Sequence, residues 1–331
     1  MVAVNTCLQG DVRQVLPELL LGGLEVQCVV TSPPYWRLRD YGHPDQLGQE
    51  DSPEKYIGEM VKVFDLVKRL LRPDGVMWLN VGDTYSASRS AHRFDNLHPS
   101  AVRGPGVPDG LSGLPGKNLL GLPWRLALAL QSRGWIIRAD CIWHKPSPMP
   151  ESVKDRPTRS HEHVFLMSKS LNYYYDWEAV AEPAGGDHPR RQDKEFQAPG
   201  QARHKGLRKK ALKKRSVRES VDLRGGNQGN GLMSWDLEFR NLRDVWTVPT
   251  ESHTGKNHYA SFPRRLAEIC IKAGSRPGDI VFDPFMGSGT VAEVAENLGR
   301  QWAGVELNPD YIDLQHKRLA KVNPLLRAAN I

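Results

Sequence analysis

A short apolar run that ends in two prolines constrains the fold of this chain more than any other feature. Residues 26–30 read VQCVV, and TSPPYW follows at 31–36. The run has the length and the β-branched content of a buried strand. Proline fixes φ and donates no hydrogen bond to a neighbouring strand, so the strand must end at Pro33. Because open α/β sheets bind ligands at the carboxyl ends of their strands, we expect Ser32 and Tyr35 to border a ligand site, with a plain exit turn as the alternative.

A second pattern of strand, glycine turn and helix lies far downstream. The apolar residues 280–282 lead into DPFMGSGT at 283–290, and a helical pattern follows at 291–298. Glycines after a strand let the backbone approach a ligand closely, and the first turn of a helix offers free N–H groups. The next short strand ends in Glu306. A carboxylate about 20 residues beyond such a turn is suited to binding a ribose diol.

Together the two stretches resemble the amino-group DNA methyltransferases that use S-adenosylmethionine. In that family a (Ser/Asp/Asn)-Pro-Pro-(Tyr/Phe) tetrapeptide is the catalytic loop, and an Asp-Pro-Phe-x-Gly-Ser-Gly-Thr turn binds the methionine part of the cofactor. These would be residues 32–35 and 283–290 here. The catalytic loop comes first and a long insertion separates it from the cofactor turn, an order that resembles the permuted β group. The resemblance extends from residue 4 to residue 319, except for 182–243.

The resemblance implies a Rossmann-like α/β fold, that of the S-adenosylmethionine-dependent methyltransferases. It would be circularly permuted, with a mostly parallel seven-stranded sheet, an antiparallel edge hairpin and a DNA-recognition insertion. The first strand should then lie beside the strand that ends at Glu306. The implied division is a catalytic part at 1–181, a target-recognition insertion at 182–245 and a cofactor-binding part at 246–331.

Periodicity and turn signals place the individual elements. Strands are expected at 2–8, 26–30, 76–81, 135–143, 164–167, 280–282 and 301–306. Helices are expected at 12–20, 53–71, 118–133, 264–273, 291–298 and 309–319, with a turn at 72–75.

The resemblance also assigns roles to residues. Asp11 would hydrogen-bond the adenine amino group of the cofactor, unless it only caps the helix that follows. A His-x-x-Ser-Phe-Pro segment, 258–263, would bind the methionine carboxylate, unless Ser261 only caps the next helix. The implied catalytic residues are Ser32, Pro33, Pro34 and Tyr35. The implied cofactor-binding residues are Asp11, His258, Ser261, Phe262, Pro263, Asp283, Pro284, Phe285, Gly287, Ser288, Gly289, Thr290, Glu306 and Asn308.

The charge of the chain favours an anionic partner. The net charge is +7 and the isoelectric point is near 9.2. Residues 203–218 hold nine Lys or Arg and no acid. Such a run is often a solvated or disordered tail, but its place between the two motifs favours a segment that clamps DNA. The implied DNA-binding residues are Arg37, Arg39, Lys205, Arg208, Lys209, Lys210, Lys213, Lys214 and Arg215.

Cysteine spacing and apolar content argue against several other classes of protein. Cys7, Cys28, Cys141 and Cys270 lie far apart and lack any Cys-x-x-Cys spacing, so we expect neither a zinc site nor a disulfide framework, and no metal. Three of them lie in apolar patterns typical of buried structural thiols. The sequence shows no signal peptide and no apolar run of about 18 residues, which predicts a cytoplasmic protein without membrane contact.

The implied reaction is methyl transfer to an exocyclic amino group of a base. The nitrogen lone pair is delocalised into the ring and the base is stacked, so the base must be flipped out and held in line with the methyl group. Ser32 and the Pro33 carbonyl would polarise the amino group, and Tyr35 would stack on the base. Ser32 and its TSPPYW context resemble the cytosine-N4 subgroup of the family. This resemblance implies a site-specific enzyme that methylates N4 of cytosine, in restriction-modification or epigenetic marking.

Other functions remain open at this point. Adenine N6 is the first alternative, and an inactive DNA-binding homologue or a protein or RNA methyltransferase are further ones. The expected partner is double-stranded DNA, with a cognate restriction endonuclease as a second candidate. The expected assembly is a monomer or a homodimer.

Overall fold

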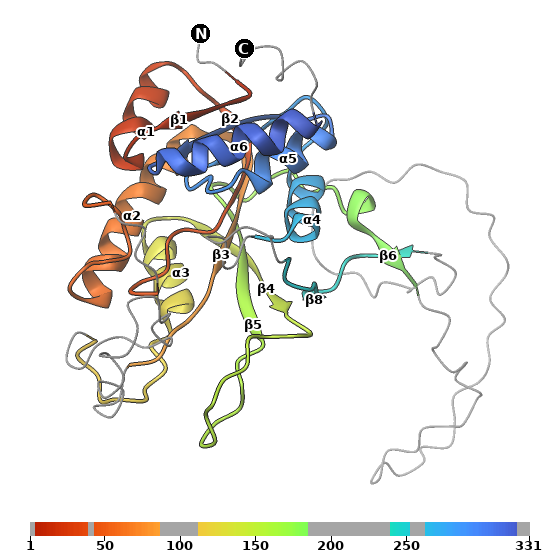
Figure 1. Cartoon of the computed structure of the whole chain (residues 1–331). Helices are drawn as coiled ribbons and strands as arrows, with labels where there is room; N and C mark the ends of the chain where they lie inside the picture. Colours follow the sequence, from red (N-terminus) through yellow and green to blue (C-terminus); the bar gives the residue numbers. More distant parts are fainter. Residues whose placement is uncertain (1–3, 39–42, 87–111, 185–238, 252–261, 323–331) are drawn as a thin grey trace, which may run out of the picture. The chain divides into compact units, whose positions relative to one another are not determined.

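The computed structural model describes residues 4–38, 43–86, 112–184, 239–251 and 262–322 of the 331-residue chain (Figure 1). The chain divides into two compact units. The first consists of Met1–Val180 and Asn241–Ile331, and the second of Ala181–Arg240.

A mostly parallel sheet forms the centre of the first unit. Its order is β1, β10, β9, β2, β3, β5, β4, β8, and neighbours run parallel except at β5, which is antiparallel to β3 and to β4. Gln9 of β1 lies opposite Glu306 of β10, so the predicted pairing of these two strands is confirmed. The strands are β1 (Thr6–Gln9), β2 (Val26–Thr31), β3 (Leu71–Val81), β4 (Ile136–His144), β5 (His161–Ser168), β8 (Val245–Thr247), β9 (Ile280–Asp283) and β10 (Gln301–Glu306).

The fold class is confirmed, but two details of the predicted sheet are wrong. The sheet has eight strands within the described ranges instead of seven, because β8 pairs with β4 and moves the β4–β5 hairpin one strand in from the edge. A strand of three residues is too short for a recognisable alternation, and only the burial of Trp246 marks it. The predicted turn at 72–75 lies within β3, as a bulge: Val26 pairs with Leu71, but Cys28 pairs with Val76.

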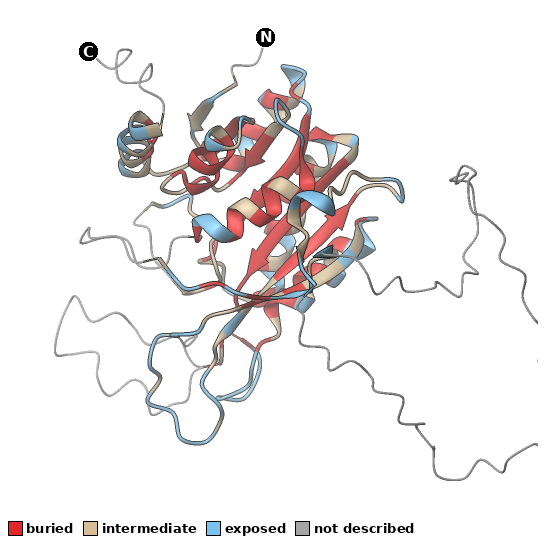
Figure 2. Ribbon diagram, turned by 90° about the vertical axis from the view of Figure 1, so that its right-hand side faces the viewer, coloured by how far each residue is buried: buried red, intermediate tan, exposed pale blue. Residues whose placement is uncertain are grey.

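Helices cover both faces of the sheet. They are α1 (Val12–Leu21), α2 (Pro53–Leu70), α3 (Leu122–Ser132), α4 (Arg264–Gly274), α5 (Thr290–Asn297) and α6 (Pro309–Val322). The core formed with α1, α2 and α3 includes Val29 and Phe282, and the core formed with α4 and α5 includes Val30 and Val281. Alternate residues of a strand therefore serve opposite layers, which explains why β2 is buried along its whole length. Figure 2 shows the central strands of the sheet as buried, and Figure 1 labels the helices around them.

Capping residues set the helix boundaries. Ser52 accepts a hydrogen bond from the Lys55 N–H and Pro53 occupies the first turn of α2, as the sequence indicated. The predicted start of α3 at residue 118 is wrong, since the helix begins at Leu122. Gly121, in a left-handed conformation with φ of 68°, precedes it, and Pro123 follows in the first turn.

The second unit is described only at its two ends. There β6 (Glu182–Pro183) pairs antiparallel with β7 (Phe239–Arg240), and Arg240 Nε lies 3.1 Å from Glu182 Oε1. The basic run at 203–218 lies outside the described residues. The boundaries of the predicted insertion, 182–245, stay a prediction.

The cysteines of the first unit are free thiols. Cys28, Cys141 and Cys270 are buried, as expected for structural thiols, and burial raises the pKa of Cys141 to about 12. Within the described ranges, none of the helices combines the length and the apolar character that crossing a bilayer requires.

Candidate active site

A cavity of about 260 Å³ opens at the edge of the sheet where the parallel strands end. The residues after β1, β2, β9 and β10 line it, together with the last residues of β3 and β4. Strand β5 runs in the opposite direction and therefore begins at this edge, where it contributes Glu162. The two sequence motifs thus meet in one cavity, although about 250 residues separate them in the chain.

Most of the predicted site residues that the structure describes line this cavity. They are Asp11, Ser32, Pro33, Pro34, Tyr35, Phe262, Asp283, Pro284, Phe285, Gly287, Ser288, Thr290, Glu306 and Asn308. Among the described residues, Arg37, Pro263 and Gly289 are not part of the lining. The predicted residues that lie outside the described ranges are Arg39, Lys205, Arg208, Lys209, Lys210, Lys213, Lys214, Arg215, His258 and Ser261.

The loop of residues 32–35 is held in place by α2 and by the segment that follows the loop. The Tyr56 hydroxyl donates to the Pro34 carbonyl at 2.9 Å. Trp36 is fully buried, and its indole N–H donates to the Glu50 carbonyl at 2.8 Å. Arg37, a predicted DNA contact, has a positive φ of 54° and donates to the same carbonyl at 3.2 Å. These contacts fix the backbone on both sides of Tyr35.

Sequence reasoning missed a group of polar residues around Tyr35. Ser32 Oγ donates to the Tyr35 hydroxyl at 3.1 Å, and this hydroxyl donates to Glu162 Oε2 at 2.7 Å. Asn80 Nδ2 donates to the same carboxylate oxygen at 3.1 Å. Lys145 forms an ion pair with the other carboxylate oxygen. The ends of β2, β3, β4 and the start of β5 therefore converge on one carboxylate.

Gly82 leaves the space that the Tyr35 ring occupies. A Cβ atom at residue 82 would lie 2.6 Å from Tyr35 Cε2 and 3.4 Å from Glu162 Cδ, and real Cβ atoms do not approach a ring as closely as the first of these distances. The glycine is therefore required by the close approach of the ring, and any side chain there would displace Tyr35.

The surroundings raise the pKa of Tyr35 and lower the pKa of Glu162. Burial, and next the charge of Glu162, raise the pKa of Tyr35 well above its ordinary value. Burial alone would also raise the pKa of Glu162, but the charge of Lys145 and the hydrogen bonds from Lys145, Tyr35 and Asn80 lower it below the ordinary value. Near neutral pH the tyrosine is protonated and the glutamate is an anion.

The glycine turn is closed by Glu306. Its Oε2 accepts from the Gly287 N–H and its Oε1 from the Asn308 N–H, both at 2.8 Å. Gln315 of α6 donates to the Gly287 carbonyl at 2.7 Å. Burial raises the pKa of Glu306 despite these hydrogen bonds. The turn therefore presents a carboxylate whose two oxygens are already oriented by backbone N–H groups.

Asp283 connects the two motifs directly. The Thr31 hydroxyl donates to its Oδ1 at 2.7 Å, and the Phe285 N–H donates to the same oxygen at 3.0 Å. The side chain is buried, and burial raises its pKa from 3.8 to about 7. The neighbouring charge of Glu306 acts in the same direction.

This raised pKa makes a prediction about stability. A carboxyl group whose folded-state pKa is raised binds its proton more tightly in the folded protein, so its contribution is present below pH 3.8 and is lost as the pH rises to about 7. Asp283→Asn removes this titration and keeps the acceptor oxygen for Thr31 and Phe285. Between pH 5 and pH 8 the free energy of unfolding of the variant, minus that of the wild type, should rise by about 3 kcal/mol. Urea unfolding at several pH values measures this difference, and a difference that does not change with pH would contradict the assignment.

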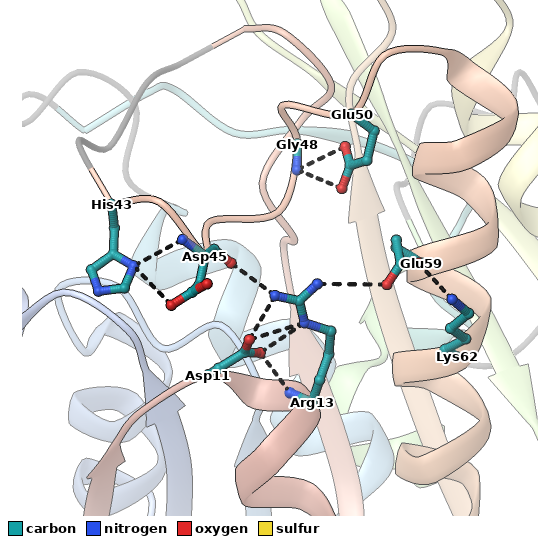
Figure 3. Close-up of polar contacts among 8 residues, drawn as sticks. All are labelled: Asp11, Arg13, His43, Asp45, Gly48, Glu50, Glu59 and Lys62. Carbon is teal, nitrogen blue, oxygen red and sulfur yellow. Dashed lines mark hydrogen bonds and ion pairs between the residues drawn. The ribbon is translucent and has the colours of Figure 1, made fainter.

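Asp11 caps α1, which was the alternative to its predicted contact with the cofactor. Its Oδ1 accepts from the Arg13 N–H at 2.9 Å and so caps α1, and both its oxygens contact the Arg13 guanidinium (Figure 3). Arg13 also reaches the Asp45 carbonyl at 3.1 Å and Glu59 at 3.6 Å. Burial would raise the pKa of Asp11, but the hydrogen bonds from Arg13 lower it. Because the carboxylate also lines the cavity, its predicted contact with the adenine stays a prediction.

The start of α4 differs from the expected cap. Its N-cap is Pro263, and the Arg264 N–H donates to Glu251 Oε1 at 2.9 Å. Ser261, proposed as a cap or as part of a cofactor segment, lies outside the described residues.

Within the described ranges, no group of three or more His, Cys, Asp or Glu is arranged so that it could hold a metal ion.

Comparisons with known proteins agree with this geometry. A family model described as DNA methylase matches residues 26–317. The Type II methyltransferase M.Cfr9I from Citrobacter freundii is 42% identical over 318 residues, which cover 95% of this chain and 87% of that protein.

Two solved structures share the fold. One is a protein from Thermus thermophilus, provisionally named a DNA modification methylase and solved in complex with S-adenosyl-L-methionine. It has a TM-score of 0.55 at 25% identity, over 96% of this chain and 93% of its own. The other is PvuII DNA methyltransferase, described as cytosine-N4-specific, with a TM-score of 0.59 at 18% identity over 99% of this chain and 93% of its own. At 18% identity the likeness concerns the fold alone.

Proposed function

The chain belongs to the N6/N4 DNA methylase family, and from this premise we propose that it transfers the methyl group of S-adenosylmethionine to the N4 amino group of a cytosine flipped out of duplex DNA. The observation that carries the proposal is the single cavity in which the loop of Ser32 and the turn of Gly287 face each other. A methyl donor on the turn and an amino group on the loop would then lie within one cavity, as in-line transfer requires.

The cavity offers the proposed cofactor free space beside Gly287 and carboxyl groups of complementary charge. A Cβ atom at Gly287 would contact only the Phe285 carbonyl oxygen, at 3.9 Å, so the backbone there leaves room for a ligand. Asp283 and Glu306 are two carboxyl groups whose pKa values burial raises, and a positively charged ligand would stabilise their anionic forms. Glu306 is the proposed partner of the ribose diol, and Asp11 of the adenine amino group. When bound, S-adenosylmethionine supplies an electrophilic methyl group on a sulfonium ion.

The catalytic loop would act on the other reactant. Ser32 Oγ and the Pro33 carbonyl are proposed to accept hydrogen bonds from the target amino group, which raises the electron density on its nitrogen. Tyr35 is proposed to stack on the flipped base, a contact worth roughly 1–3 kcal/mol in nucleic-acid complexes. The anchoring of the loop by Tyr56 and Trp36 means that these groups are held in place before the base arrives.

The choice of cytosine rests on the loop sequence. Serine opens the tetrapeptide, and the surrounding TSPPYW resembles the cytosine-N4 subgroup. The test is to incubate the protein with labelled S-adenosylmethionine and unmethylated genomic DNA, digest the DNA to nucleosides and identify the methylated one by mass. N4-methylcytosine is the expected product. N6-methyladenine would refute the choice of base and retain the reaction, whereas cofactor binding without methylation of any DNA would favour an inactive homologue.

The DNA contacts and the partners extend the proposal. The basic residues between 203 and 218 would neutralise phosphates, which is the main source of sequence-independent affinity for DNA. Arg39 would act at the rim of the cavity, whereas Arg37 is engaged with the loop that follows it. A cognate restriction endonuclease as partner, and a monomer or homodimer as the active form, belong to the same proposal.

A prediction separates the two glycines of the turn. Gly287 and Gly289 both have left-handed backbones, with φ of 53° and 80°, but a Cβ atom at Gly289 would lie 2.9 Å from Gln315 Cγ of α6. Gly287→Ala should therefore fold and weaken S-adenosylmethionine binding by at least about 10-fold, because its methyl group enters the ligand's space.

Gly289→Ala serves as the matched comparison. Its added methyl group meets Gln315 instead of the cavity, so it should mainly lower the free energy of unfolding, by about 2 kcal/mol. Calorimetric titration and thermal melting measure the two effects. Unchanged cofactor affinity in a folded Gly287→Ala protein would place the cofactor elsewhere.

A further inference from the structure

Two acceptors face the hydroxyl group of Tyr35. Glu162 Oε2 lies 2.7 Å from it and Asn80 Oδ1 lies 3.3 Å from it. An ionised carboxylate can only accept. The Asn80 amide is oriented by its own donors, since Nδ2 donates to Glu162 Oε2 and to the His163 carbonyl, each at 3.1 Å. Its oxygen must therefore face Tyr35, and the single hydroxyl proton of Tyr35 is directed toward these two acceptors.

The direction of the next hydrogen bond follows from this one. Ser32 Oγ lies 3.1 Å from the Tyr35 hydroxyl oxygen. Because the Tyr35 proton points to Glu162, the tyrosine oxygen can only accept, and Ser32 must donate its one proton to it. The lone pairs of Ser32 then remain for the cavity that this residue lines. Ser32 therefore presents a hydrogen-bond acceptor to a ligand in the cavity. The Glu162 carboxylate, two hydrogen bonds away, fixes this direction.

We propose that Glu162 is a positioning residue that fixes the direction of the Ser32–Tyr35–Glu162 chain, so that the catalytic loop accepts a hydrogen bond from an amino group and rejects a carbonyl oxygen in the same place. The inference rests on the proposed function, because it takes a base as the ligand of the loop. Cytosine and adenine present an amino group where uracil and hypoxanthine present a carbonyl oxygen. Two acceptors that face each other repel, so the loop distinguishes cytosine from uracil and adenine from hypoxanthine.

The surroundings of Glu162 keep it in the accepting state. Its side chain is largely buried, and Lys145 holds the oxygen that Tyr35 does not use. The Lys145 ammonium group is itself placed over the Trp143 ring, 4.4 Å from the ring centre. Burial would raise the pKa of Glu162, but the charge of Lys145 and the hydrogen bonds from Lys145, Tyr35 and Asn80 lower it, so Glu162 remains an anion near neutral pH.

The lysine also determines what a glutamine would do at this position. Lys145 can only donate, so the amide oxygen of a glutamine would take the place of Oε1 beside it. The amide NH₂ group would then replace Oε2 and face both Tyr35 and the Nδ2 donor of Asn80, so the Asn80 amide would have to turn and present its oxygen to the new NH₂ group. Tyr35 would accept from it and donate to Ser32, and Ser32 would turn its proton toward the cavity. Glu162→Gln should therefore reverse the chain, at the cost of the hydrogen bond between Asn80 and the His163 carbonyl.

The experiment compares two DNA duplexes that differ at the base that the wild-type enzyme methylates. One carries the target base and the other its carbonyl analogue, uracil for cytosine or hypoxanthine for adenine. Dissociation constants are measured with S-adenosylhomocysteine present, and single-turnover methylation is measured on the natural duplex. The wild type should prefer the amino base by at least about 10-fold. Glu162→Gln should lose or reverse this preference and methylate about 100-fold more slowly, with unchanged cofactor affinity.

A matched control and a second variant separate the role of Glu162 from general effects of the substitution. Glu268→Gln alters another glutamate held by a lysine, Lys272 at 2.6 Å, away from the cavity lining, and should keep both the rate and the preference. A Glu162→Gln protein that binds cofactor normally and keeps the wild-type preference would overturn the proposal. If that variant does not fold, Tyr35→Phe breaks the same chain and should lower the preference, and an unchanged preference would overturn it equally. A wild-type protein that methylates no DNA would instead refute the proposed function.

Discussion

Ser32→Ala is expected to lower the rate constant of methyl transfer by about 100- to 1,000-fold, the loss typical for removal of one preorganised polar contact to a reacting centre. The hydroxyl group lies at the cavity end of the chain that runs through Tyr35 to Glu162. Its hydrogen bond to the amino group matters most when the nitrogen develops positive charge, so it stabilises the transition state more than the bound substrate. The affinities for cofactor and for DNA should therefore change little.

Single-turnover assays with a fluorescent base analogue beside the target separate base flipping from chemistry. Ser132→Ala is a suitable control, because that hydroxyl donates only to the Leu128 carbonyl of its own helix, at 2.9 Å. Methylation at the wild-type rate by Ser32→Ala would leave the backbone of the tetrapeptide and Tyr35 as the only catalytic groups of the loop.

The second large effect is expected at Glu306. Both oxygens accept backbone N–H groups, those of Gly287 and Asn308. Glu306→Gln would set an NH₂ group against one of these N–H groups and remove the charge that is proposed to bind the ribose diol. Charge-assisted hydrogen bonds contribute about 1.5–3 kcal/mol each, so the dissociation constant for S-adenosylmethionine should rise by about 100-fold or more.

Calorimetric titration measures this constant directly. Asp313→Asn removes a carboxylate from the exposed side of α6 and should bind cofactor as the wild type does. A Glu306→Gln protein with wild-type affinity would show that the ribose is held by other residues.

Local signals in the sequence were sufficient for most of the sheet and for both motifs. The β-branched run before Pro33 and the glycines after β9 identify strand ends, because proline and glycine act on their own backbone. The carboxyl ends of parallel strands share one edge, so these motifs could be placed together without a structure. The sequence placed Ser32 and Asp283 each at the end of a strand, the family resemblance implied that they act together, and the structure places both on one cavity.

The residues that sequence reasoning missed depend on long-range pairing. Glu162 lies near the start of β5, and only the antiparallel direction of that strand brings it to the edge where the other strands end. Its partner Tyr35 is 127 positions away in the chain. A glutamate between two histidines has no local feature that distinguishes it from a solvated side chain. Residues 156–163 are polar and basic as a whole, and such a stretch gives no sign of a buried anion.

The pairing of β1 with β10 has a consequence for the newly made chain. In the described sheet β1 is an edge strand, and its neighbour, β10, ends at Glu306. A ribosome that adds about 5–20 residues per second needs roughly 15–60 seconds to reach that neighbour after β1 has been made. During this interval β1 has no sheet to join, and Asp11, just after it, has no cavity to line. The cavity that Asp11 and Glu306 both line can therefore be complete only after synthesis has passed Glu306.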